Sequence, residues 1–234
     1  MKREILVLLP GMMCNARLFA PQVDVLGAQY DIIIPDLNAH SVSEMASRVL
    51  SGCKSDQFNL AGLSMGGIVA MEMVRQAPHR ISRLGLLDTN HFADAPEKFD
   101  MRNRQIEDVK NGKLREVIIE EMKPVYLAER NRSNQALLDT LIEMAIEVGP
   151  DAFIAQSLAL RDRVDQTETL RDFDGPSLVL CGEEDNLCPP ERHRQIAALL
   201  PNAELRIVPG AGHITTLETP DAVNQAMADW LGRS

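Results

Sequence analysis

The chain has 234 residues, of which 45% are hydrophobic and 25% charged, and its formal net charge is −10 at pH 7. A chain of this length can bury one sizeable core, or one core with an inserted lobe. The acidic balance argues against nucleic acid as the main partner, because phosphate contacts need clustered lysine and arginine. The first apolar stretch covers only about six residues, which is too short for a signal peptide or a membrane span.

The four cysteines show no Cys-x-x-Cys spacing. We therefore expect free thiols in a soluble, cytoplasmic protein. The chain also lacks a His-x-x-x-His pair and a clustered cysteine pair, so we expect no metal site and no cofactor.

Apolar runs alternate with helix-period segments in the first 89 residues. Strands are predicted at residues 5–9, 30–34, 58–63 and 81–87, with helices at 21–27, 41–53 and 65–77. Ser41 has the position of an N-cap residue, with Glu44 completing a capping box. This order is typical of an α/β fold with a mostly parallel, doubly wound sheet that carries helices on both faces.

The alternation stops after residue 89 and returns near residue 175. Helices are predicted at residues 96–112, 114–122, 133–149 and 150–160, with Ser133 as the cap of the third. We expect residues 90–174 to form an all-helical cap over the carboxyl ends of the strands, which would shape a substrate pocket and exclude water. The core would then consist of residues 1–89 and 175–234, and its last strands would be 177–181 and 204–208, followed by a helix at 221–231.

Ser64 lies at the junction between a predicted buried strand and a helix, in the sequence Gly62-Leu-Ser-Met-Gly66. Small residues on either side allow strand and helix to approach closely, so that the hydroxyl projects from a strained turn. Ser64 is therefore the candidate nucleophile. A glycine-rich turn that only packs well is the simpler alternative. A phosphate-binding turn is disfavoured, since the spacing is not Gly-x-Gly-x-x-Gly and no Lys-Ser/Thr follows the glycines.

Two further polar residues also follow predicted strands. Asp185 lies in a turn after strand 177–181, and His213 lies in the loop Pro209-Gly-Ala-Gly-His after strand 204–208. A histidine can take the proton of a serine hydroxyl, and a carboxylate fixes the imidazole tautomer. Ser64, Asp185 and His213 therefore have the residue types and the order of a catalytic triad.

Three segments of the chain resemble a known family. Gly-Leu-Ser-Met-Gly-Gly, Gly-Glu-Glu-Asp-Asn-Leu-Cys-Pro-Pro and Gly-Ala-Gly-His are similar to the nucleophile elbow, acid turn and histidine loop of the α/β-hydrolase superfamily, especially its small bacterial esterase-like members with a helical cap. The resemblance implies an oxyanion hole built from the N–H groups of Met65 and Met12. Many relatives have His-Gly where this chain has Pro10-Gly11. We expect Gly11 to permit the turn that aims a backbone N–H at the site.

Several roles have alternatives. Asp88 also follows a strand and is a second candidate for the acid, and the remaining histidines are more typical of surface or helix-end positions: His40, His79, His91 and His193. Three arginines of the predicted cap are candidates for binding a substrate carboxylate, although solvent-facing charge is the simpler interpretation: Arg102, Arg104 and Arg161.

The sequence and the resemblance together predict a carboxylesterase-like serine hydrolase that cleaves esters of small to medium acyl groups through an acyl-enzyme intermediate. Its partner would be a small-molecule ester. The same triad also fits a hydrolase of carbon–carbon bonds, a lactonase or an acyltransferase. A non-catalytic ligand sensor on a hydrolase scaffold is the alternative from another class.

Overall fold

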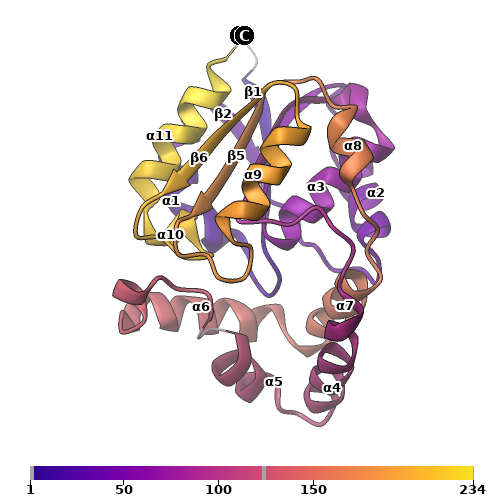
Figure 1. The fold of residues 1–234 in the computed structure, drawn as a ribbon, viewed down its shortest axis with the longest axis vertical. Helices are drawn as coiled ribbons and strands as arrows, with labels where there is room; N and C mark the ends of the chain where they lie inside the picture. The colour runs from indigo at the N-terminus through magenta and orange to yellow at the C-terminus, as the bar shows by residue number, and fades with distance from the viewer. Residues whose placement is uncertain (1–2, 123–124, 234) are drawn as a thin grey trace.

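The computed structural model describes residues 3–122 and 125–233. Its centre is a six-stranded sheet in the order β2-β1-β3-β4-β5-β6, and every neighbouring pair is parallel (Figure 1). The strands are β1 (Glu4–Leu9), β2 (Tyr30–Ile33), β3 (Phe58–Leu63), β4 (Ile81–Leu87), β5 (Ser177–Gly182) and β6 (Ala203–Val208). Strand β1 lies inside the sheet, and the chain runs from it to β2 at the edge. The chain then crosses back to form β3 on the other side of β1. Ligands bind at such a switch point in open α/β sheets.

Helices cover both faces of the sheet (Figure 1). One face carries α2 (Val42–Gly52), α3 (Met65–Gln76), α8 (Thr167–Arg171) and α9 (Pro190–Leu199), and the other carries α1 (Ala20–Leu26), α10 (Thr215–Glu218) and α11 (Pro220–Leu231). The predicted α/β class with a doubly wound parallel sheet is therefore confirmed.

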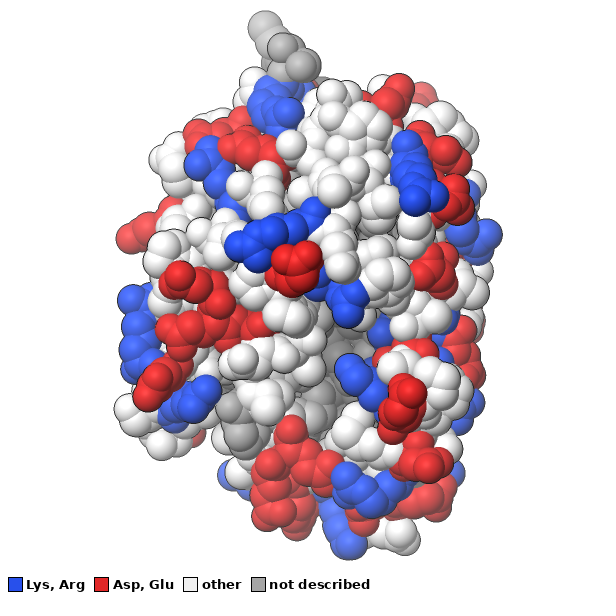
Figure 2. Space-filling model, in the orientation of Figure 1, with Lys and Arg blue, Asp and Glu red and all other residues white. Residues whose placement is uncertain are grey.

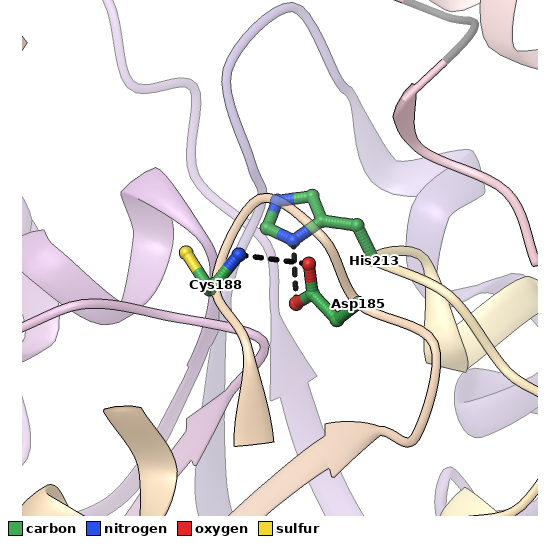
Figure 3. Close-up of side chains that lie close together, drawn as sticks. All are labelled: Asp185, Cys188 and His213. Carbon is green, nitrogen blue, oxygen red and sulfur yellow. Dashed lines mark hydrogen bonds and ion pairs between the residues drawn. The ribbon is translucent and has the colours of Figure 1, made fainter. Parts of the chain in front are cut away.

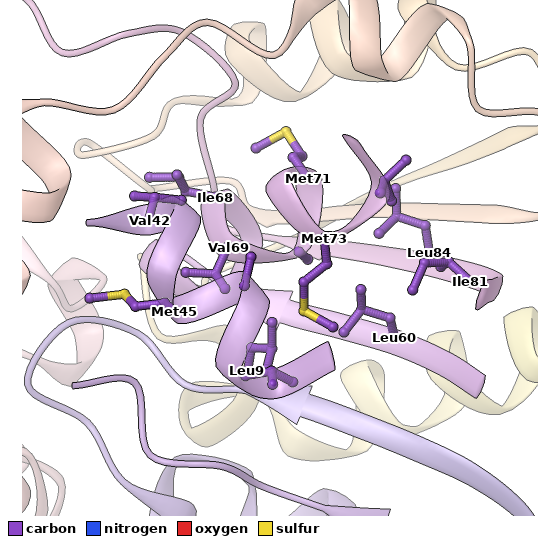
Figure 4. Packing of buried hydrophobic residues seen from close by; sticks show 14 of the residues in the cluster. Leu9, Val42, Met45, Leu60, Ile68, Val69, Met71, Met73, Ile81 and Leu84 are labelled. Carbon is purple, nitrogen blue, oxygen red and sulfur yellow. The ribbon is translucent and has the colours of Figure 1, made fainter. Parts of the chain in front are cut away.

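The main core lies between the sheet and the α2–α3 pair. Strand β3 is buried along its whole length, as expected for a central parallel strand with helices on both faces. Leu60 of this strand and Val69 and Met73 of α3 belong to one apolar cluster (Figure 4). Because this cluster fixes α3 against β3, the turn between them, which contains Ser64, has a rigid support on both sides.

Between β4 and β5 the described residues form helices and loops and no strand. Besides α8, the helices are α4 (Phe99–Lys110), α5 (Leu114–Glu116), α6 (Gln135–Val148) and α7 (Pro150–Arg161), with a π-helical segment at Val117–Met122 and short 3₁₀ turns at Pro96–Lys98 and Glu129–Asn131. Figure 1 shows α4 to α7 beyond the carboxyl ends of the strands. A third apolar cluster joins these helices to Met13, in the loop after β1.

Some local predictions need correction. The cap of α6 is Asn134, whose side chain accepts a hydrogen bond from Leu137 N, and not Ser133. Ser41 does cap α2 through the N–H of Glu44, but the Glu44 carboxylate pairs with Arg48. Part of the loop expected after β1 is a 3₁₀ turn at Ala16–Phe19, and the sequence did not predict the short helices α8 and α10. No helix in the described ranges is long and apolar enough to cross a membrane.

Candidate active site

Ser64 occupies a strained turn between β3 and α3. Its φ of 56° and ψ of −116° place a non-glycine residue in a backbone region that L-residues rarely adopt. A Cβ added to Gly66 would lie 1.9 Å from the carbonyl oxygen of Leu9, and one added to Gly62 would lie 2.2 Å from the carbonyl oxygen of Gly66. Both positions therefore require glycine, because backbone atoms occupy the space of any side chain.

Two hydrogen bonds join Ser64, His213 and Asp185. Ser64 Oγ lies 2.9 Å from His213 Nε2, and His213 Nδ1 lies 2.8 Å from Asp185 Oδ2 (the latter in Figure 3). The carboxylate requires Nδ1 to carry a proton, so Nε2 is free to accept the serine hydroxyl proton. The other oxygen, Asp185 Oδ1, accepts the N–H groups of Leu187 and Cys188 at 2.9 and 2.8 Å, which fixes the carboxylate in its turn.

The environment of His213 favours its protonated form. Burial alone would lower the pKa of this imidazole, but the charge of Asp185 and its hydrogen bond outweigh burial, so the pKa lies above its ordinary value of 6.5. His213 and Asp185 are only 1% and 2% exposed. Their interaction is therefore weakly screened by solvent.

The histidine loop is held by groups that the sequence reasoning did not identify. The carboxylate of Glu218 accepts the N–H of Gly212 at 2.8 Å and, through its second oxygen, the N–H of Ala128 at 2.8 Å. The N–H of His213 donates to the carbonyl of Tyr126 at 2.7 Å. The segment 126–128 and the histidine loop are thus held together by contacts between residues that are far apart in the sequence.

Asp88, the second candidate for the acid, lies close to the site without touching the imidazole. Its Oδ1 accepts the N–H of Gly182 at 3.0 Å, and its Oδ2 accepts the N–H and hydroxyl of Thr215. Burial, followed by the charge of Asp185, raises the pKa of Asp88 well above its ordinary value. Its φ of 45° is also positive. Asp88 links the strand end before Asp185 to the helix after His213.

The other histidines do not contact Ser64 in the described hydrogen bonds. His193 is buried at the start of α9, where its Nε2 accepts the N–H of Thr89 at 2.9 Å, and burial lowers its pKa to about 4. His91 is buried against Phe92 with a pKa likewise lowered by burial to about 4. His40 and His79 are exposed.

Three potential metal ligands also meet at this site. Ligand atoms of Asp185, Cys188 and His213 lie within 4.8 Å of one another (Figure 3). A metal would need the Cys188 thiolate, but burial raises the pKa of this thiol well above its ordinary value. It would also need Nδ1 of His213 without its proton, whereas the hydrogen bond to Asp185 uses that proton. The arrangement therefore favours proton transfer over metal binding.

The two methionines expected to form the oxyanion hole both line the cavity at Ser64. In the part of the chain that the structure describes, the backbone N–H groups of Met12 and Met65 donate to no protein acceptor. The neighbouring Met13 has a φ of 57°, and its N–H donates to Oε1 of Gln156 at 2.9 Å. Gly11 has no positive φ, and a Cβ there would make only ordinary contacts at 3.5 Å, so the expected role of this glycine is wrong.

A cavity of about 350 Å³ opens above Ser64. Its walls come from the turns after β1, β3, β4 and β5 and from the helical region between β4 and β5. Apolar side chains make up much of the lining: Met12, Met65, Ile68, Met101, Met122, Val125, Leu160 and Leu187. Of the three arginines considered from the sequence, only Arg102 lines the cavity, whereas Arg104 pairs with the lining residue Glu121 and Arg161 pairs with Asp162 outside the cavity.

A serine hydroxyl at the floor of a cavity, joined through a buried imidazole to a buried carboxylate on a parallel sheet of this order, defines a class of protein. The family model for the alpha/beta hydrolase fold matches residues 4–220, so the chain belongs to this family.

Its relatives are enzymes of several kinds. A thermophilic esterase from Thermogutta terrifontis, solved with malate bound, superposes with a TM-score of 0.92 at 29% identity, over 97% of this chain and 89% of that one. The pimeloyl-[acyl-carrier protein] methyl ester esterase of Xanthomonas oryzae pv. oryzae is 26% identical over 95% of this chain and 92% of its own length. A third relative is the dihydrolipoyllysine-residue acetyltransferase component of the acetoin cleaving system of Pseudomonas putida, which is 26% identical over 88% of this chain. The present chain spans only 57% of the length of that protein.

Proposed function

We propose that the protein is a serine hydrolase that cleaves carboxylic esters of small to medium acyl groups through an acyl-enzyme intermediate. The observation that carries this proposal is the pair of hydrogen bonds, 2.9 Å from Ser64 Oγ to His213 Nε2 and 2.8 Å from His213 Nδ1 to Asp185 Oδ2, at the floor of a largely apolar cavity. Two relatives with the same fold are named as esterases, which favours ester cleavage over the other reactions of this triad.

In the first half of the reaction, Ser64 Oγ attacks the ester carbonyl carbon while His213 Nε2 takes its proton. Asp185 stabilises the resulting imidazolium. The negative charge that develops on the carbonyl oxygen is stabilised by the N–H groups of Met65 and Met12, and each such donor typically contributes about 2.7 to 4 kcal/mol to lowering the barrier. His213 then protonates the leaving alkoxide, and the acyl group remains on Ser64.

Hydrolysis of the acyl-enzyme repeats these roles with water. His213 removes a proton from the water as it attacks the acyl carbonyl, and then returns the proton to Ser64 Oγ as the bond breaks. The free acid leaves, and the site regains its starting protonation state.

The helices between β4 and β5 would serve as a cap, residues 90–174, on a core of residues 1–89 and 175–234. Three observations support this division. The described part of the segment contributes no strand to the sheet. Its helices α4 to α7 lie beyond the strand ends, whereas the short α8 packs against α3 and α9, and the segment supplies a large part of the cavity lining. A cap here would shield the bound substrate from bulk water during the reaction.

The test is hydrolysis of short 4-nitrophenyl esters by the wild type and by Ser64→Ala. We expect the variant to lose about 10⁶-fold in kcat and to lose labelling by a fluorophosphonate probe. Ser133→Ala is the matched control, because Ser133 is an exposed serine outside the cavity lining. Retention of ester turnover and labelling in Ser64→Ala would refute the proposal. Faster turnover of dienoates or lactones than of esters would leave the assignment of the triad in place but would assign a different reaction to it.

A further inference from the structure

Two guanidinium groups share one carboxylate in the wall of the cavity. Asp94 Oδ2 lies 2.5 Å from Arg102 Nε, and Asp94 Oδ1 lies 3.0 Å from a terminal nitrogen of Arg163. All three residues line the cavity, and their side chains are at most 13% exposed. One negative charge therefore faces two positive charges at a site with limited access to solvent.

The two arginines differ in how their donors are used. Arg163 also donates from Nε to the carbonyl of Phe92 and from a terminal nitrogen to the carbonyl of Leu160, each at 2.9 Å. Its donors are therefore used to hold the surrounding backbone. Arg102 donates only through Nε, and its two terminal nitrogens have no acceptor among residues 3–122 and 125–233. These are the donors that a guanidinium presents to a carboxylate as a pair.

The remaining charged residues of the lining do not cancel the excess of positive charge that the two arginines leave. Lys98 lines the same cavity and forms no ion pair with any residue that the structure describes. Glu121, the other acidic residue of the lining, is neutralised from outside by two contacts with Arg104 at 3.0 and 2.7 Å. The cavity is thus locally positive in a chain of net charge −10, whose outer surface mixes both signs (Figure 2).

We propose that the cavity binds esters that carry a second, ionised carboxylate, held by the terminal nitrogens of Arg102 with support from Lys98. This inference rests on the proposed ester hydrolysis and specifies its substrate class. Asp94 keeps Arg102 in place through Nε and leaves the outer edge of the guanidinium for the substrate. The same cavity is lined by apolar side chains, which suit a short methylene chain between the ester and the second carboxylate.

The test compares matched pairs of esters at equal chain length. Monomethyl adipate carries the carboxylate on the acyl side, with methyl hexanoate as its neutral partner. 6-Acetoxyhexanoate carries it on the alcohol side, with hexyl acetate as its neutral partner. For at least one pair, we expect the wild type to favour the acidic ester in kcat/KM, and Arg102→Gln to reduce that preference by about 10- to 100-fold, the usual contribution of charge-assisted hydrogen bonds.

Arg115→Gln is the matched control, since it removes the same charge from the helical region at an exposed position outside the cavity lining. It should keep the wild-type preference. A second measurement is independent of turnover: titration of adipate into Ser64→Ala by calorimetry, with and without Arg102→Gln. We expect the second substitution to weaken binding by a similar factor.

The outcomes separate the two proposals. If the wild type hydrolyses no ester but adipate binds in an Arg102-dependent manner, the hydrolase proposal fails and the anion site stands. If the wild type hydrolyses neutral esters as well as acidic ones, or if Arg102→Gln changes neither the preference nor adipate binding, the anion site is wrong and the hydrolase proposal stands.

Discussion

The side-chain oxygen of Gln156 on α7 accepts the backbone N–H of Met13 at 2.9 Å, while its nitrogen donates to the carbonyl of Leu37 at 2.8 Å. One buried amide thus ties the loop after β1 to the loop after β2. Because the Met13 N–H belongs to the peptide group that follows Met12, this amide helps to hold the backbone that carries the Met12 N–H.

Gln156→Leu should lower kcat by about tenfold or more, as expected when one oxyanion donor is displaced. It should also destabilise the fold by about 1 to 3 kcal/mol for each buried backbone group left unpaired. The measurements are ester kinetics and urea unfolding. Gln195→Leu, at an exposed position on α9, is the control. An unchanged kcat in Gln156→Leu would show that the loop is held by other contacts.

Asp185→Asn and Asp88→Asn should have different effects. The first places an amide donor against His213 Nδ1, which selects the wrong tautomer and should reduce kcat by about 10⁴-fold. The second leaves the hydrogen bond between His213 and Asp185 intact, but its amide N–H₂ would face donors from Gly182 or Thr215, so it should mainly lower the free energy of unfolding. Kinetics and urea unfolding of both variants distinguish these effects. The opposite pattern would make Asp88 the acid.

The rate should fall at acidic pH because His213 must be neutral to take the proton of Ser64. Since Asp185 holds the pKa of His213 above its ordinary value, the acidic limb of kcat/KM should have its midpoint above pH 6.5. Asp185→Asn, measured at high enzyme concentration, should move this midpoint down. A midpoint at or below 6.5 in the wild type would contradict the electrostatic assignment.

His193 should make the free energy of unfolding fall at acidic pH. Its folded pKa of about 4 lies below the ordinary 6.5, so the unfolded chain binds the proton first. Its contribution is fully present above pH 6.5 and is lost as pH falls toward about 4. His193→Gln keeps an acceptor for Thr89 N–H and does not titrate, so its unfolding free energy should fall less steeply over this range. His79→Gln, at an exposed position, should keep the wild-type slope; an identical slope in His193→Gln would refute the assignment.

The central fold could be predicted because buried parallel strands leave a strong local signal. Residues 5–9 and 178–181 are continuous apolar runs, the run at 58–63 is interrupted by Asn59, and the structure has strands at each of them. The short helices α8 and α10 have four or five residues each, too few for a helical period to be visible. The choice of Asn134 over Ser133 as a cap depends on one residue of register, which two adjacent capping residues cannot decide.

The candidate site was predictable only in part, for a different reason. Ser64, Asp185 and His213 each follow a strand in a recognisable local motif. The groups that hold them have no such motif: Gln156 acts on a loop 143 positions away in the sequence, and the Asp88 contact with Thr215 spans 127 positions. The cavity-facing position of Arg102 likewise depends on Asp94 and on the packing of α4 against α7.

Among the described residues, the non-glycine positions with positive φ are Met13, Ser64 and Asp88, and each follows closely on a strand that ends at the cavity. Such conformations typically cost about 1 to 3 kcal/mol each. Glycine would adopt these conformations without strain, so a search for heat-resistant variants would select glycine substitutions at these three positions. Any gain in melting temperature obtained there would come at the expense of turnover, and the two properties would have to be improved in different parts of the molecule.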